Sequence, residues 1–175
     1  MQAIVVNNKA AALVHDRKAP QLRHDYVLVR TVAIALNPGD WRTVASPRPV
    51  PNAILGCDFA GIILEVGPGN NAKGWAVGEH VCGCAPGGST KDADFGTFAE
   101  TIIAPSDYCI RIPHGMSFED AASVGLSGMT VGQGLFYKMG LRLPDHSADS
   151  AGKEWLLVYG GSTAAGTLAI QLAKL

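Results

Sequence analysis

The sequence predicts a mixed α+β chain, in which a small all-β, barrel-like domain comes first and helices follow. Short apolar segments separated by glycine and proline turns recur at near-regular spacing up to about Pro113, as in small β-barrels. After Ser117 the hydrophobic spacing becomes helical. Near the end, an apolar run at 156–159 leads through a Gly-Gly-Ser-Thr turn into helical spacing at 164–175. This strand–turn–helix pattern is typical of the first unit of a phosphate-binding, doubly wound domain.

The composition is that of a globular chain without a charged or membrane-bound partner. Of its 175 residues, 47% are hydrophobic and 17% charged, which is enough apolar surface for a packed core. Lys and Arg number 14 and Asp and Glu number 15, so no charge excess points to nucleic acid or an anionic membrane. No apolar run approaches the roughly 18 residues of a membrane span, and the N-terminus lacks a signal-peptide pattern. We therefore expect a cytoplasmic protein.

The expected strands of the barrel-like domain follow one another from the N-terminus. Residues 3–6 and 11–15 flank the turn Asn7-Asn8-Lys9 as a hairpin, and residues 26–36 alternate as a longer strand. Pro38 and Gly39 demand a turn, and residues 41–51, which include three prolines, are expected to be an irregular surface segment. Later strands are expected at 62–66, after Gly78, at 98–103 and at 108–112.

The helical part begins at a recognisable cap. Ser117 is a candidate N-cap, and the two acidic residues that follow it lie where the helix dipole favours negative charge. This helix can extend to Val124, and a second one can run over 127–139. The polar residues 145–153 predict a linker loop.

The four cysteines, Cys57, Cys82, Cys84 and Cys109, do not have the spacing of a structural zinc site. Cys82 and Cys84 are two residues apart, and no second close pair follows them. Reduced, partly buried thiols are the expected state in a cytosolic chain.

Several motifs in a fixed order carry a family resemblance. GCDFAG at 56–61, VGPG at 66–69 and VGEHV at 77–81 resemble the GxDxxGxVxxVG…GDxV signature of the medium-chain dehydrogenase/reductase superfamily. Residues 119–134 resemble that superfamily's helix before the cofactor domain, and residues 159–175 resemble its nucleotide-binding start. The resemblance implies a GroES-like catalytic domain at 1–115, bridging helices and a linker at 116–154, and the incomplete start of a Rossmann dinucleotide-binding domain at 155–175.

The resemblance is narrower than the superfamily. A catalytic zinc needs three protein ligands, but residues 37–40 contain no cysteine, Cys57 replaces the usual histidine, and residues 125–132 supply no third ligand, so no metal is expected. YGGSTA at 159–164 and NPGDWR at 37–42 are similar to the trans-acting enoyl reductases that serve fungal polyketide synthases. This implies an NADPH-dependent oxidoreductase of secondary metabolism. Its reaction would be hydride transfer to Cβ of an α,β-unsaturated thioester held on an acyl-carrier domain of the synthase.

The same resemblance implies the site residues. Thr130 falls where such enzymes place a threonine near the nicotinamide and the substrate. The implied cofactor contacts are Gly39, Asp40, Trp41, Arg42, Ser162, Thr163, Ala164 and Ala165. The implied acyl pocket consists of Val131, Gly132, Gln133, Gly134, Leu135, Phe136, Tyr137 and Lys138.

Each of these assignments has a structural alternative. Arg42 can be a solvated surface arginine, and the Thr130 hydroxyl can bond back to its own helix. The apolar side chains at 131, 135 and 136 have the helical spacing of core residues. Thr163 replaces the middle glycine of the dinucleotide fingerprint, and its hydroxyl could compensate by donating a hydrogen bond to a phosphate.

Two other functions remain open at this stage. One is a zinc-free quinone oxidoreductase that also uses NADPH. The other is a truncated, non-redox module that keeps the barrel-like domain for binding a partner.

Overall fold

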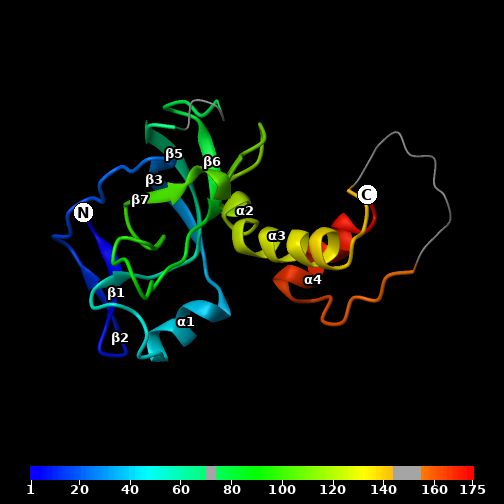
Figure 1. Ribbon diagram of the computed structural model, residues 1–175, viewed down its shortest axis with the longest axis horizontal. Coiled ribbons are helices and arrows are strands. Elements are labelled where there is room, and N and C mark those ends of the chain that lie inside the picture. The colour runs from blue at the N-terminus through cyan, green and yellow to red at the C-terminus, as the bar shows by residue number, and fades with distance from the viewer. Residues whose placement is uncertain (70–73, 144–154) are drawn as a thin grey trace. The chain divides into compact units, whose positions relative to one another are not determined.

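The computed structural model describes residues 1–69, 74–143 and 155–175, which form two compact units, Met1–Gly125 and Leu126–Leu175 (Figure 1). The linker expected at 145–153 lies outside the described residues. Within the described part, no helix combines the length and apolar character that crossing a membrane would require.

The first unit is built on two antiparallel sheets, which confirms the expected all-β start of a mixed fold. The smaller sheet has the strand order β2-β1-β4, and the larger has the order β7-β3-β5-β6-β8. The smaller sheet contains β1 (Ala3–Asn7), β2 (Ala10–Val14) and β4 (Ala53–Ile54). The larger contains β3 (Tyr26–Ala35), β5 (Asp58–Val66), β6 (His80–Cys84), β7 (Thr101–Pro105) and β8 (Cys109–Arg111), with the short 3-10 helix η2 (Ser106–Tyr108) before β8.

The main core of this unit lies on one face of the larger sheet. The pairing of the central strand β5 with β3 and β6 brings these side chains together on that face, where they are fully buried. The buried cluster contains Val27, Val29, Phe59, Ile63, Val81, Ile102 and Ala104. The hairpin β1–β2 closes as expected, with positive φ at Asn8 (48°) and Lys9 (61°), the backbone of a two-residue type I′ turn.

The segment after β3 corrects the sequence-based expectation, because Pro38–Ala45 forms helix α1. Pro38 stands at the first helical turn, where its missing N–H costs nothing. The N–H of Asn37 donates to Asp40 Oδ2 at 2.7 Å, as in a capping box. The prediction of irregular structure from Trp41 onwards was therefore wrong for the first half of that segment, since Pro and Gly here begin a helix.

The next helix, α2 (Phe118–Ala122), is capped at Ser117 as the sequence predicts. It begins after Ser117, whose Oγ accepts from the Asp120 N–H at 3.1 Å. It packs its alanines against β5 and β6. The helix expected at 127–139 begins at Gly125 instead, as α3 (Gly125–Gly132), and continues as the π-helix η3 (Gln133–Lys138).

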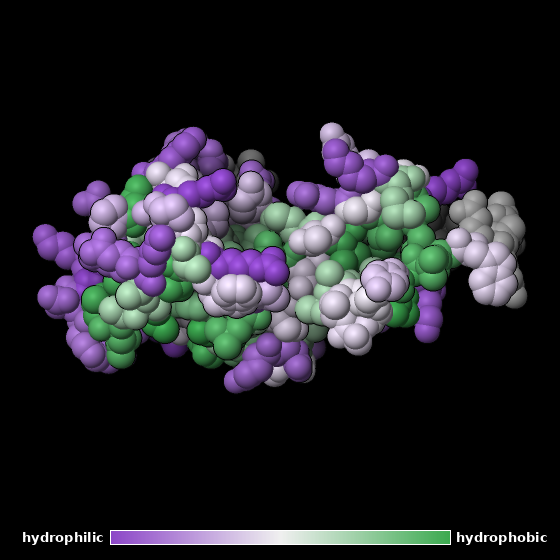
Figure 2. Space-filling model, turned by 90° about the horizontal axis from the view of Figure 1, so that it is seen from below, coloured by the Kyte–Doolittle hydropathy of each residue, from purple (hydrophilic) through white to green (hydrophobic). Residues whose placement is uncertain are grey.

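The second unit packs α3 and η3 against α4 (Ala164–Leu172). Its buried residues are Val131, Leu135 and Ala169. Residues 156–159, expected as a strand, are not assigned to one: 156–158 have no regular structure and Tyr159 lies in a turn, because no described strand lies beside them and a lone strand has no hydrogen-bonding partner. Leu156 and Val158 nevertheless pack on the helices. Hydrophobic side chains are exposed on this unit as well as on the first (Figure 2).

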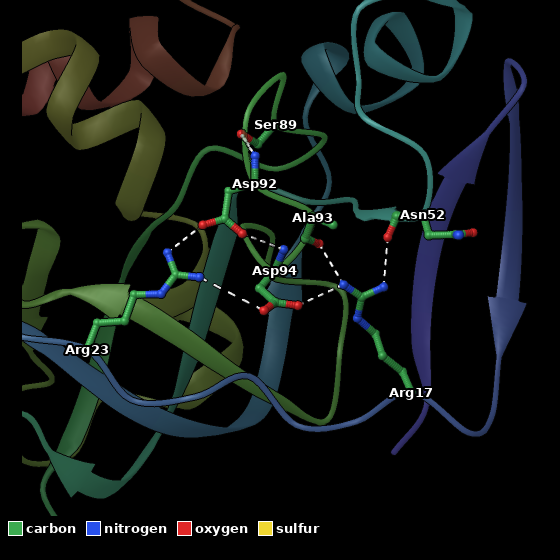
Figure 3. A network of polar contacts seen from close by, with 7 residues as sticks. All are labelled: Arg17, Arg23, Asn52, Ser89, Asp92, Ala93 and Asp94. Carbon is green, nitrogen blue, oxygen red and sulfur yellow. Dashed lines mark hydrogen bonds and ion pairs between the residues drawn. The ribbon is translucent and has the colours of Figure 1, made fainter.

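In the first unit, Arg17 fastens two distant loops (Figure 3). Its guanidinium donates to the carbonyl oxygens of Asn52 (2.7 Å) and Ala93 (2.8 Å) and to Asp94 Oδ1 (2.8 Å). Residues 85–97 contain little regular structure, and the bonds from Arg17 add to the one that the Ala93 carbonyl accepts from the Ile54 N–H at 2.9 Å.

A second arginine holds the same loop. Arg23 forms an ion pair with Asp92, and its other nitrogen lies 3.9 Å from Asp94 Oδ2. Its guanidinium also lies 5.9 Å from the centre of the Tyr26 ring and 5.2 Å from that of Phe95, within cation–π range.

Asp92→Asn should lower the free energy of unfolding by about 1 kcal/mol at pH 7, a modest value because both partners are partly exposed. The hydrogen bond from Arg23 is the main cause that lowers the pKa of Asp92. A carboxylate with a depressed folded pKa stabilises above its unfolded pKa of about 3.9, and that stability is lost as pH falls through the folded value. The difference in the free energy of unfolding between wild type and variant, measured by urea unfolding, should therefore shrink below about pH 4. Glu65→Gln, at an exposed carboxylate, is the control. A difference in the free energy of unfolding that does not change with pH would show that the Asp92 charge is not its cause.

Candidate functional site

The turn before α4 leads into a capped helix N-terminus. Gly160 adopts φ 83°, and Thr163 is the N-cap. The Thr163 Oγ1 accepts from the Gly166 N–H at 3.0 Å and donates to the Gly160 carbonyl at 2.8 Å. The hydroxyl proton is therefore engaged inside the turn and not directed at a ligand, unlike the suggested donation to a phosphate.

Gly166 closes this turn and was not among the predicted site residues. It is buried, and a Cβ built on it would lie 2.2 Å from the Gly160 carbonyl oxygen. Gly161, Thr163 and Gly166 stand at the three glycine positions of a GxGxxG spacing, which is the signal that could have identified it.

The other predicted residues of this turn lie at its open end. Ser162 and Ala164 are exposed, and Ala165 is half-buried. The first N–H groups of a helix have no partner within the helix, and they point together with the positive end of the dipole. The turn can therefore receive an anionic group through its backbone.

Thr130 lies on α3 with its side chain exposed, and its Oγ1 donates to the Leu126 carbonyl at 2.8 Å. This is the back-bonding that the sequence left as the structural alternative. The oxygen lone pairs can still accept a hydrogen bond from outside the helix.

The predicted acyl-pocket residues divide into two groups. Val131 and Leu135 are 6% exposed and pack in the core of the second unit, and Phe136 packs partly against them. Gly132 and Gly134 are half-buried, and the exposed members are Gln133, Tyr137 and Lys138. The exposed members are the ones that can meet a ligand directly.

The predicted residues at 39–42 all lie in α1 in the first unit. Asp40 is 9% exposed because its carboxylate turns back onto the Asn37 N–H. Trp41 is 64% exposed, and the Arg42 guanidinium lies 5.5 Å from the centre of its ring. Arg42 is thus an exposed, permanent cation on a short helix.

Polar residues cluster beside α1, and two of them, Asn37 and Asp58, are not among the predicted site residues. Asp58 is 1% exposed, and its Oδ2 accepts from Asn37 Nδ2 at 2.8 Å. Burial raises the pKa of the Cys57 thiol to about 11, and the charges of Asp40 and Asp58 add to that effect. The partly buried Cys57 therefore stays protonated near neutral pH, which disfavours a role as a nucleophile. The signal for Asn37 and Asp58 was their place in the NPGD and GCD motifs.

Metal-binding side chains do not gather in the described ranges, 1–69, 74–143 and 155–175. There, no three His, Cys, Asp or Glu residues lie close enough to hold an ion together.

The order of strands, the α1 segment and the α4 turn define a class of protein. Residues 23–114 match the alcohol dehydrogenase GroES-like domain, and the chain belongs to this family. The expected resemblance to the medium-chain dehydrogenase/reductase superfamily is thereby confirmed.

More particular relatives are trans-enoyl reductases of fungi. The chain is 49% identical to the trans-enoyl reductase TOXD of Cochliobolus carbonum over 94% of its own length and 54% of that protein. It is 45% identical to the trans-enoyl reductase resD of Aspergillus sclerotiorum, over 100% of the chain and 51% of the relative. The chain thus spans about half the length of these relatives.

Solved structures give the same fold. An alcohol dehydrogenase superfamily protein of Novosphingobium aromaticivorans matches 99% of this chain and 50% of its own, with a TM-score of 0.81 and 27% identity. The quinone oxidoreductase of Coxiella burnetii matches 99% of this chain and 53% of its own, with a TM-score of 0.73 and 28% identity. A mycobacterial protein complexed with NADPH matches 99% and 50% of the two chains, with a TM-score of 0.76 and 27% identity.

Proposed function

We propose that this chain belongs to an NADPH-dependent trans-acting enoyl reductase that acts on the α,β-unsaturated thioester of a growing polyketide. The observation that carries the proposal is the 49% identity to a trans-enoyl reductase along 94% of the chain. The partner would be the acyl-carrier domain of the synthase, because a thioester intermediate of this kind is held there.

The α4 turn fits a dinucleotide. Gly166 lies so close to Gly160 that there is no space for a Cβ, and the first N–H groups of α4 are at the exposed end of the turn. In our proposal, the backbone at Ser162, Ala164 and Ala165 holds a cofactor phosphate, and Thr163 keeps the turn in shape. NADPH, when bound, supplies the hydride for the β-carbon of the substrate.

The remaining assignments are proposals for the side chains that are exposed in each unit. Arg42 would pair with a phosphate or contact a ribose, with Gly39, Asp40 and Trp41 shaping the helix that carries it. Thr130 would accept a hydrogen bond through its free lone pairs. Gln133, Tyr137 and Lys138 would contact the acyl chain, while Val131 and Leu135 would support that wall from the core.

A quinone oxidoreductase is the second candidate. It is supported by a solved quinone oxidoreductase at 28% identity and a TM-score of 0.73. The trans-enoyl reductases share 39–49% identity with this chain, so substrate class is better argued from them.

The test begins with a fluorescence titration of the chain with NADPH, followed by turnover assays with an enoyl thioester and with a quinone. Saturable enhancement of nicotinamide fluorescence and consumption of NADPH with the thioester would support the proposal. Consumption with the quinone alone would favour the second candidate. Absence of any binding would contradict both and favour a non-redox partner module.

Arg42→Ala should weaken NADPH binding by about tenfold, because a charge-assisted hydrogen bond to a phosphate is lost. Arg42→Lys should recover part of that loss, since it keeps the charge without the planar fork. Arg48→Ala, at another exposed arginine, is the matched control for net charge. Equal affinity in wild type and Arg42→Ala would reject the assignment.

A further inference from the structure

Asp58 is a carboxylate enclosed on several sides. It is 1% exposed, and a Cβ built on Gly125 would lie 2.6 Å from its Oδ1 and 2.3 Å from the Gly83 carbonyl oxygen. Only a glycine can stand at 125 while the carboxylate keeps its place. Burying a charge in this way costs free energy unless hydrogen bonds compensate, so the bonds that Asp58 makes have structural consequences.

One of those bonds leads directly to α1. Asp58 Oδ2 accepts from Asn37 Nδ2 at 2.8 Å, and the Asn37 N–H donates to Asp40 Oδ2 at 2.7 Å. Asn37 is the N-cap of α1, so the first turn of that helix is linked to strand β5 through the chain Asp58–Asn37–Asp40.

Helix α1 depends on such a link. It has only eight residues, too few for a helix to be stable by itself in water. Its Val44 side chain packs against a core cluster of the first unit but is only partly buried. Trp41 and Arg42 point into solvent from the same helix. The orientation of the Arg42 cation therefore follows from how the start of α1 is held.

We propose that Asp58 is a positioning residue, whose buried carboxylate fixes the N-terminus of α1 and so the orientation of the exposed Arg42 side chain on that helix. The link between Asp58 and α1 stands on the contacts above, whereas its consequence for the cofactor rests on the proposed function. The Asp58 charge also contributes to the raised pKa of Cys57, which lies next to it in sequence.

Two variants test this link in different ways. Asn37→Ser keeps a residue that favours the N-cap position but is too short to reach Asp58. Asp58→Asn keeps the size of the side chain and removes its charge. Ile63→Val, a mild change in the core of the same strand β5, is the control for general destabilisation.

The first measurement is hydrogen exchange, which needs no enzymatic activity. Both variants should accelerate exchange of the amides at 40–45 by about tenfold relative to the amides of β5. Ile63→Val should change the rate of amide exchange in α1 and in β5 by the same factor. The proposal is overturned if exchange in α1 changes no more than exchange in β5 in Asn37→Ser, the milder variant.

The second measurement is steady-state kinetics with NADPH. Both variants should raise KM for NADPH by about fivefold with kcat within about twofold, since binding geometry is altered and the reacting groups are not. A wild-type chain that binds no NADPH would refute the proposed function, yet the exchange result would still decide whether Asp58 holds α1. Faster exchange in α1 with unchanged KM would overturn the role toward the cofactor.

Discussion

Replacing Gly166 with alanine should reduce NADPH affinity about a hundredfold, close to the loss of the site. The added Cβ would lie 2.2 Å from the Gly160 carbonyl oxygen and 2.9 Å from Gly161 Cα. Because both contacts are to backbone, either the turn or the start of α4 must move by about an ångström, and a shift of that size can cost a hundredfold. The N–H groups at Ala164 and Ala165 would then no longer converge on one phosphate.

Fluorescence titration of NADPH measures this loss, and circular dichroism checks that the helices remain. Thr167→Ala is the matched control, because it lies on the exposed side of the same helix one residue further on. Its affinity should stay within about twofold of wild type. Unaltered binding by Gly166→Ala would show that the nucleotide does not use the N-terminus of α4.

Gly61→Ala should destabilise the first unit by about 3 kcal/mol or more. Gly61 lies in β5, the central strand of the larger sheet, and its Cβ would be 2.2 Å from the Arg30 carbonyl oxygen and 2.7 Å from Val29 Cγ1. Both atoms belong to the paired strand β3, which cannot yield without breaking its ladder to β5. Urea unfolding, followed by circular dichroism, gives the change in the free energy of unfolding.

Two other glycines separate the causes. Gly78 has φ 87° with open space around its Cβ position, so Gly78→Ala should cost about 1 kcal/mol from backbone strain alone. Gly39 lies within α1, also in open space, and Gly39→Ala should be neutral or slightly stabilising. If Gly61→Ala is no worse than Gly78→Ala, close strand packing at this motif is refuted.

Local patterns predicted the elements that short-range chemistry decides. The hairpin turn at Asn8 and the cap at Ser117 form where their side chains and φ preferences require. The motif glycine at 61 was identifiable by spacing, although the sequence does not say which atom it makes room for. The α1 segment differs from the prediction because Pro and Gly often break regular structure, whereas Pro is also favoured at the start of a helix.

The candidate site was predictable in its backbone part and less so in its side chains. The turn at 160–163 and the helix after it follow from a spacing that any phosphate-binding turn needs. The hydroxyls of Thr130 and Thr163, by contrast, donate to carbonyl oxygens within their own segments. Which partner a hydroxyl selects depends on distances of a few tenths of an ångström, and a motif does not contain them.

The class of fold, the family and the place of the glycine turn could be predicted from the sequence, because apolar periodicity and glycine spacing express backbone requirements directly. The contact of Asp58 with Asn37, 21 residues earlier, and that of Arg17 with Asp94, 77 residues later, became visible in the three-dimensional fold. Such pairs form because strand pairing and loop closure bring distant residues together, and their residue types alone carry no record of the partner. The proposed cofactor site depends on the GGST turn, whose shape depends on the Thr163 hydrogen bonds and on the close approach of Gly166 to Gly160.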